Sequence, residues 1–173
     1  GLPRATWGTA FAHAGVGLAL IGIVCETTWN SEYISTMKPD DVAKVAGYEL
    51  KLDGLAQRQG PNFREMTAHF TVNLDGRKLS VMTPSKRSFT TRGSSTTEAA
   101  LLTRGASQLY ISLGEATAEG AIAVRIYHKP MVLLIWWGPV LMAFGGMLSL
   151  SDRRLRVGAP KPGKASRALQ PAE

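Results

Sequence analysis

The segment Thr67 to Met82, TAHFTVNLDGRKLSVM, carries the clearest strand pattern in this chain. Apolar and polar residues alternate as far as Leu74, which puts every second side chain on the same face of a β-strand. The pair Asp75-Gly76 follows and favours the tight turn of a two-residue hairpin. Because the alternation resumes at Lys78, the segment predicts two antiparallel strands joined by that turn.

The residues on either side extend this pattern to a whole domain. Further strands are predicted at Tyr48 to Leu55 (YELKLDGL), Gln108 to Leu113 (QLYISL) and Ile122 to Tyr127 (IAVRIY). Gly60-Pro61-Asn62 predicts a turn, and Thr97 to Thr103 predicts a short helix that Glu98 would cap. Five or so antiparallel strands in about 100 residues predict a small β-barrel or sandwich spanning 26–129.

Two uncharged apolar segments flank this domain, Ala5 to Cys25 and Met131 to Leu150. Each is close to the ~20 residues that cross a ~30 Å hydrocarbon core. Trp136 and Trp137 lie near the start of the second segment, where aromatic residues of membrane interfaces are common. We therefore predict two transmembrane helices, 5–25 and 131–150. The alternative is a pair of buried helices in a soluble protein.

The distribution of charge predicts an orientation. The chain of 173 residues has a formal net charge of +7, and its last segment, Asp152 to Glu173, holds six basic and two acidic residues. Beside an apolar span, such a segment is typical of a cytoplasmic end rather than of nucleic-acid binding. We therefore expect 152–173 to be a disordered cytoplasmic tail and 26–129 to be periplasmic in a Gram-negative inner membrane. With Cys25 as its one cysteine, the chain forms no internal disulfide.

The first apolar segment is rich in glycine and alanine and contains one histidine, His13. Pairs of small residues four positions apart, such as Gly8 with Ala12 and Gly15 with Ala19, let helix backbones approach closely in lipid, so we expect this helix to pack against other helices or against a flat ligand. An ionisable residue at this depth usually faces the protein interior. The position of His13 in the segment leaves two interpretations of this residue open. It makes a hydrogen bond to a neighbouring helix, or it has a metal, haem or proton-relay role.

Other reactive side chains predict ordinary structural roles. His69 falls in a predicted strand and His128 near the end of the last one, and neither has a second ligand at metal-binding spacing. The sequence contains no phosphate-binding loop, no zinc motif and no nucleophile–base pattern. From the residues alone, the prediction ends at a membrane-anchored domain with a buried histidine. Because the first residue is Gly1, the chain is expected to be a C-terminal piece of a longer protein.

A series of short motifs then identifies a resemblance. In order along the chain they are Ala12-His13-Ala14-Gly15, Gly47-Tyr48, Gly60-Pro61-Asn62, Pro84-Ser85-Lys86-Arg87, Thr96-Thr97-Glu98-Ala99, Leu109-Tyr110, Leu113-Gly114-Glu115, Val124-Arg125 with Tyr127, Lys129-Pro130, Trp136, Gly145-Gly146 and Asp152-Arg153-Arg154. Together with the membrane layout, this ordered set resembles the C-terminal part of cytochrome c maturation protein F (CcmF), the haem lyase component of the bacterial system I pathway. The CcmF/CycK/CcsA superfamily and the related haem lyase of nitrite reductase assembly (NrfE) share much of it.

The resemblance implies a function in cytochrome c biogenesis. The family takes haem from the haem chaperone CcmE and, with a CcmH-type subunit, attaches it to apocytochrome c. His13 matches one of two transmembrane histidines that ligate a b-type haem in this family. The resemblance therefore implies that His13 is an axial ligand of haem b iron and that the rest of the same polypeptide supplies the second ligand.

The same resemblance limits what this chain does alone. The family's tryptophan-rich haem-binding segment, its periplasmic haem-binding histidines and its second transmembrane histidine are absent from these residues. The parent protein would be the enzyme, and this chain alone would not be catalytic. The rival hypothesis is a non-catalytic, membrane-anchored β-domain that binds or scaffolds partners. Five basic residues are interpreted as a solvated face, with pairing to haem propionates or lipid phosphates as the alternative: Arg58, Arg64, Lys86, Arg87 and Arg92.

Overall fold

The structure is a computed structural model that describes residues 2–90, 93–117 and 120–152. Its described residues divide into two compact units, one within 1–17 and 138–173 and the other within 18–137. Two helices cross from one unit to the other, α1 (Arg4–Trp29) and α2 (Leu134–Leu150), and the first unit contains 4–17 of α1 and 138–150 of α2. The second contains the remaining turns of both helices and all the strands. Of the predicted cytoplasmic tail, 153–173 lies outside the described residues.

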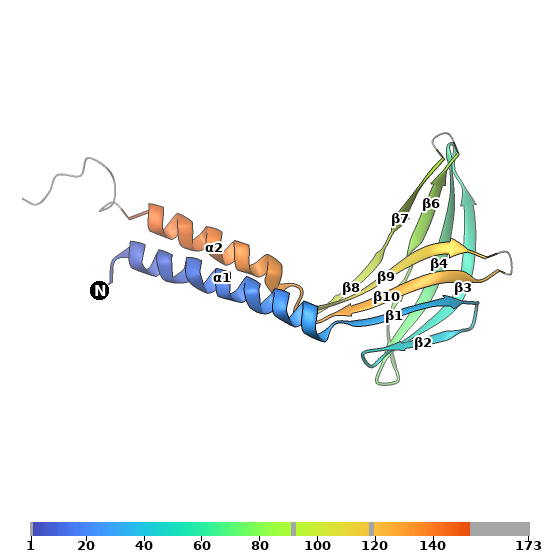
Figure 1. The fold of residues 1–173 in the computed structure, drawn as a ribbon, viewed down its shortest axis with the longest axis horizontal. Helices are drawn as coiled ribbons and strands as arrows, with labels where there is room; N and C mark the ends of the chain where they lie inside the picture. The colour runs from blue at the N-terminus through green and yellow to red at the C-terminus, as the bar shows by residue number, and fades with distance from the viewer. Residues whose placement is uncertain (1, 91–92, 118–119, 153–173) are drawn as a thin grey trace, which may run out of the picture. The chain divides into compact units, whose positions relative to one another are not determined.

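Ten antiparallel strands form the β domain (Figure 1). One sheet has four strands in the order β1-β10-β9-β8, and the other has the order β2-β3-β4-β6-β7, with β5 also paired to β4. The strands are β1 (Ser31–Met37), β2 (Val42–Val45), β3 (Tyr48–Gln59), β4 (Phe63–Leu74), β5 (Arg77–Met82), β6 (Ser85–Phe89), β7 (Ser94–Glu98), β8 (Ala100–Arg104), β9 (Ser107–Ala116) and β10 (Ile122–Lys129).

The two sheets bury their alternating apolar residues against each other. Leu50 and Leu52 of β3 and Phe70 of β4 come from one sheet, while Ile111 of β9 and Val124 of β10 come from the other. All five are inaccessible to solvent. The period-two pattern therefore places one face of each sheet in a common core, which makes the domain a sandwich.

All five predicted strands are present, and the hairpin turn is confirmed. Asp75 and Gly76 have φ values of 51° and 73°, the left-handed conformations that a type I′ turn requires at both central positions. β3 and β4 are each 12 residues long and meet at the predicted turn around Gly60-Pro61-Asn62. The long strands were therefore recognisable from their residues.

The prediction of a short helix from Thr97 to Thr103 is wrong. The segment forms the end of β7 and most of β8, which belong to different sheets. All five residues of Ser94–Glu98 are polar and exposed. The segment therefore has no apolar alternation by which a strand could be recognised. β7 is held by pairing with β6, from Ser85↔Glu98 to Phe89↔Ser94. Sheet pairing thus overrides a weak local helix signal.

The two helices differ in length from the predicted spans. α1 has 26 residues and is the one helix in the described ranges that is long and apolar enough to cross a membrane. α2 has 17 residues, which at 1.5 Å per residue is roughly 26 Å, slightly less than a ~30 Å hydrocarbon core. It begins three residues later than expected because Met131, after Pro130, has a φ of 55° and opens a turn instead of a helix.

Candidate functional site

The face of α1 that contacts α2 is made of small residues. A Cβ atom on Gly8 would lie 2.5 Å from the carbonyl oxygen of Gly145, and one on Gly15 would lie 2.6 Å from that of Gly138. Real Cβ atoms do not approach backbone so closely, so only glycine permits this separation of the helices. The prediction that these positions serve helix packing is confirmed.

His13 lies on a different face of α1 and is exposed in this chain, so the prediction of a buried histidine is wrong for the residues described, and its hydrogen bond stays within its own helix. Its Nδ1 atom is 2.8 Å from the carbonyl oxygen of Thr9, one turn earlier in the helix. A carbonyl oxygen only accepts hydrogen bonds, so Nδ1 is the donor, and in the neutral imidazole Nε2 is then the nitrogen with the lone pair. Gly17, one turn later, has open space where a Cβ would be. The imidazole is therefore exposed and held by its own helix.

This arrangement meets the requirements of a haem axial ligand. Ligating histidines commonly donate their second ring N–H to a carbonyl or carboxylate, which fixes the ring and its tautomer. Among residues 2–90, 93–117 and 120–152, no group of three or more His, Cys, Asp or Glu gathers to hold a metal ion. An exposed imidazole held by its own helix suits one axial position of a porphyrin iron.

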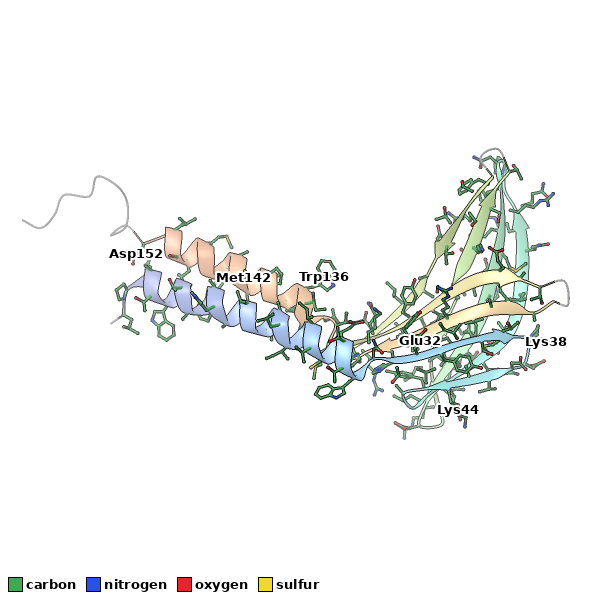
Figure 2. The ribbon with its side chains drawn as sticks, in the orientation of Figure 1. Glu32, Lys38, Lys44, Trp136, Met142 and Asp152 are labelled. Atoms are coloured by element: carbon green, nitrogen blue, oxygen red, sulfur yellow. The ribbon has the colours of Figure 1, made fainter. Side chains whose placement is uncertain are left out.

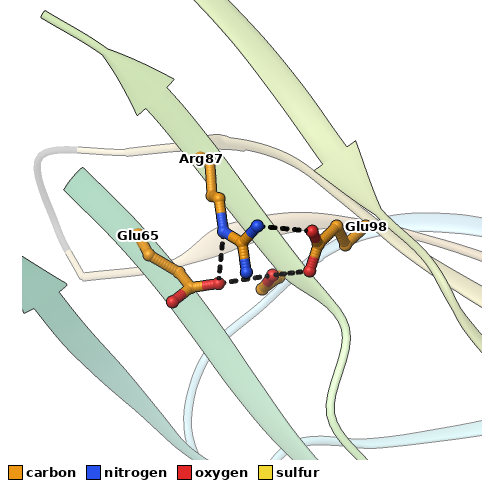
Figure 3. Close-up of polar contacts among 4 residues, drawn as sticks. Glu65, Arg87 and Glu98 are labelled. Carbon is orange, nitrogen blue, oxygen red and sulfur yellow. Dashed lines mark hydrogen bonds and ion pairs between the residues drawn. The ribbon is translucent and has the colours of Figure 1, made fainter. Parts of the chain in front are cut away.

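A second cluster of polar side chains links strands β4, β6 and β7 (Figure 3). Oε1 of Glu65 accepts hydrogen bonds from Arg87 Nε at 2.9 Å and from Ser85 Oγ at 3.1 Å. Arg87 also pairs with Oε1 of Glu98 at 2.7 Å through its Nη1. The guanidinium lies 5.2 Å from the centre of the Phe63 ring, which gives it a cation–π contact. The cluster therefore brings together two of the short motifs, Pro84 to Arg87 and Thr96 to Ala99.

The environment of Glu65 determines its ionisation. Burial opposes the charged form, but hydrogen bonds from Ser85 and Arg87 and the positive charges of Arg87 and Arg58 favour it. The net result is a pKa below the usual value for glutamate. Sequence reasoning did not find this cluster, since its members are dispersed over 34 positions and only strand register joins them. Glu98, expected to cap a helix, instead pairs with Arg87.

The other two histidines, His69 and His128, belong neither to the surroundings of His13 nor to the cluster around Glu65. His69 is exposed on β4, and His128 of β10 lies with its ring centre 5.8 Å from that of Tyr48. Partial burial lowers the pKa of His128. Their predicted structural or surface roles agree with these positions. Of the basic residues expected to form a solvated face, Lys86 and Arg87 instead make ion pairs, and Arg92 lies outside the described residues.

Charged and aromatic residues mark the junction of the helices with the β domain. Nζ of Lys129, at the end of β10, lies 2.9 Å from Oε1 of Glu26 in the last turns of α1. Trp136 and Trp137 expose 71% and 58% of their surface, and Figure 2 shows Trp136 pointing away from α1. Exposed tryptophans at the start of an apolar helix are typical of a membrane–water interface.

Comparisons with known proteins agree on one family. Residues 28–130 match the family described as the CcmF C-terminal beta-sandwich. The chain is 83% identical over its whole length to the cytochrome c-type biogenesis protein CycK of Bradyrhizobium diazoefficiens, and covers 26% of that protein. It is 37% identical to CcmF of Pseudomonas aeruginosa over 90% of its length, and covers 24% of it.

A solved structure named "Cytochrome c Heme Lyase CcmF" superposes with a TM-score of 0.71 at 17% identity, over 86% of this chain and 25% of that one. That likeness supports the fold. The chain spans about a quarter of the length of the relatives it matches. The chain therefore belongs to the CcmF family, as its C-terminal β-sandwich region.

Proposed function

We propose that this chain is the C-terminal part of a haem lyase component that handles haem and supports its attachment to apocytochrome c. The relatives are named as cytochrome c-type biogenesis proteins, which supports that general role. The finer claim depends on His13. An exposed imidazole with its Nδ1–H donated to the Thr9 carbonyl is the observation that carries it.

In this proposal, His13 Nε2 binds the iron of a b-type haem, and the second axial ligand belongs to the rest of the polypeptide. Bound haem would supply an iron centre that exchanges one electron. The protein's own contribution is orientation: the hydrogen bond to Thr9 holds the ring and, in the neutral imidazole, selects the tautomer whose Nε2 is free to bind iron. Val16 and Leu20, three and seven residues later in the helix, supply exposed apolar surface on the same side of α1.

The proposal includes a location and partners. α1 and α2 would be two spans of an inner-membrane protein with further spans, and 26–129 would be periplasmic. The turn at 131–133 is apolar and would extend α2 toward the membrane surface, where Trp136 and Trp137 lie. Haem would come from the chaperone CcmE, and a CcmH-type subunit would present the apocytochrome. Catalysis belongs to the complete protein.

The test is His13→Ala in the full-length parent protein, purified from membranes. We expect loss of most of the co-purified haem b, together with a reduced yield of cytochrome c. Haem is measured from the reduced-minus-oxidised absorbance spectrum relative to protein. His69→Ala is the matched control, because it also removes one exposed imidazole and should leave the spectrum unchanged.

The outcomes separate the two hypotheses. An unchanged haem spectrum in His13→Ala would show that this residue is not a ligand. If that variant also lost cytochrome c assembly while keeping its haem, the chain would act as a membrane-anchored scaffold with His13 in helix packing. Loss of haem in both variants would indicate general damage, which thermal unfolding of each purified protein would detect.

A further inference from the structure

The inner face of the larger sheet becomes polar at one end of the sandwich. Along β4, the residues facing the other sheet are Phe70, Ala68, Met66 and Arg64, so the apolar series ends in a guanidinium. Strand register places Lys86 beside Met66 and Ser88 beside Arg64 on the same face. A sandwich interior is normally apolar, and a polar extension of it needs solvent or a ligand.

A groove occupies this end of the domain. A pocket of about 250 Å³ lies between Arg64, Met66 and Lys86 of one sheet and Gly114, Glu115 and Ile122 of the other. A second pocket of about 270 Å³ adjoins it and shares Gln57 and Arg64. We refer to the two together as the groove: Met66 and Ile122 contribute apolar surface to the first pocket, and the second is lined by polar residues.

A β-bulge positions the one acidic residue on the far wall. β9 and β10 lose register between Leu113↔Val124 and Ala116↔Ile122, so two residues of β9, Gly114 and Glu115, are accommodated opposite Ala123. A Cβ on Gly114 would lie 2.9 Å from the Cβ of Ala123, so this close approach requires glycine. Bulges of this kind redirect side chains. Here the redirected side chain is Glu115, which crosses to the other sheet and pairs with Lys86.

The two side chains of this ion pair differ in their exposure to solvent. The Lys86 side chain is 13% exposed, whereas the Glu115 side chain is 86% exposed. A carboxylate this exposed gains little from its pairing, since water and salt compete for it. The side chain of Arg64, in the same groove, makes no hydrogen bond or ion pair with any described residue. Among the described residues, the groove thus holds two cations without such a partner, Arg58 and Arg64, and a third, Lys86, whose partner is easily displaced.

We propose that this groove binds an extended acidic peptide segment of a partner protein, whose carboxylate displaces Glu115 from Lys86. The guanidinium of Arg64 suits a second carboxylate, because its planar donors match carboxylate oxygens. The amides of Gln57 and Gln59 can bind peptide backbone, and Met66 and Ile122 can pack an apolar neighbour.

The test measures binding to the intact chain in detergent micelles. The probe is a fluorescein-labelled, amide-capped pentapeptide of alternating leucine and glutamate, followed by fluorescence anisotropy. The counterpart with glutamine in place of glutamate should not bind. Lys86→Gln and Arg64→Gln should each weaken binding about tenfold, the change expected for losing one charge-assisted hydrogen bond. Glu115→Gln should tighten binding, since it removes the internal competitor.

Lys44→Gln and Glu49→Gln are the matched controls, because Lys44 and Glu49 form an exposed ion pair at 2.6 Å elsewhere on the same sheet. They change the net charge equally and should leave binding unchanged. The proposal would be overturned by absence of saturable binding, by equal effects of Glu115→Gln and Glu49→Gln, or by complete competition from phosphate at constant ionic strength. Circular dichroism verifies that each variant is folded. The role of His13 in haem ligation does not depend on this result.

Discussion

At the scale of single residues, Glu65 shows how the strand framework controls ionisation. Only 7% of its surface is exposed to solvent, and its carboxylate accepts two hydrogen bonds. Arg87 lies between this carboxylate and that of Glu98, so one cation serves two acidic residues on neighbouring strands. A buried charge with such partners is tolerated, whereas one that lost its partner would be costly.

Glu65 should make the stability of the β domain depend on acid. Because its pKa is lower in the folded protein than in the unfolded chain, its ionisation stabilises the fold above the unfolded pKa. That contribution is lost as pH falls from near 4.5 through the lower folded value. Glu65→Gln should flatten this acid-side loss in urea unfolding curves followed by circular dichroism. Glu49→Gln, which removes an exposed carboxylate, should keep it. Parallel pH profiles for wild type and Glu65→Gln would contradict the assignment.

At the scale of elements, two adjacent glycines of α2, Gly145 and Gly146, differ in the space that a larger side chain would have. A Cβ on Gly145 would lie 2.5 Å from the backbone nitrogen of Ala12 in α1, whereas a Cβ on Gly146 would meet nothing within 4 Å. Helix propensity alone favours alanine over glycine at both positions by about 1 kcal/mol. The contact with α1 therefore decides the outcome at Gly145 only.

The neighbouring substitutions Gly145→Ala and Gly146→Ala should accordingly change stability in opposite directions. Gly146→Ala should stabilise the helix pair by up to about 1 kcal/mol. Gly145→Ala should destabilise it by about 1–3 kcal/mol, because the added methyl forces the helices apart. Thermal unfolding in detergent micelles, followed by far-ultraviolet circular dichroism, measures both. Equal changes in unfolding temperature in the same direction for both variants would mean that the helices are not in close contact at Gly145.

At the scale of the whole molecule, the proposed orientation places the β domain and the basic C-terminal segment on opposite sides of the membrane. Ser94 is exposed on β7, and Ser166 lies in the segment predicted to be cytoplasmic. Cys25 is the one cysteine of this chain, so a Cys25→Ala form of these 173 residues allows single cysteines to be placed at either site.

In that background, a membrane-impermeant maleimide added to cells with a permeabilised outer membrane should label Ser94→Cys. It should label Ser166→Cys only after the inner membrane is broken, because the arginine-rich segment is retained in the cytoplasm. Labelling is read as a mass shift on a gel. If Ser166→Cys reacted in unbroken cells and Ser94→Cys did not, the orientation would be reversed. If both reacted there, α1 and α2 would not form the proposed pair of spans.

The long strands and the first helix could be predicted from the residues because their signals are local. β3, β4 and β10 show period-two alternation, Asp75-Gly76 specifies its own turn, and the 26 residues of α1 are almost all apolar. His13 was also recognisable, since a histidine inside an apolar helix is unusual. The five additional strands were missed because they are short or polar, and their pairing comes from neighbouring strands.

The amino-acid sequence by itself thus determined an apolar helix with one histidine, a strand-rich domain and, through a set of short motifs, the family. Tertiary structure alone decided which residues meet. Hydrogen bonding between strands brought Glu65, Arg87 and Glu98 together, and a bulge directed Glu115 across to Lys86. The physical reason is that periodicity reports the environment of one element, whereas contacts between distant residues depend on strand register and sheet packing.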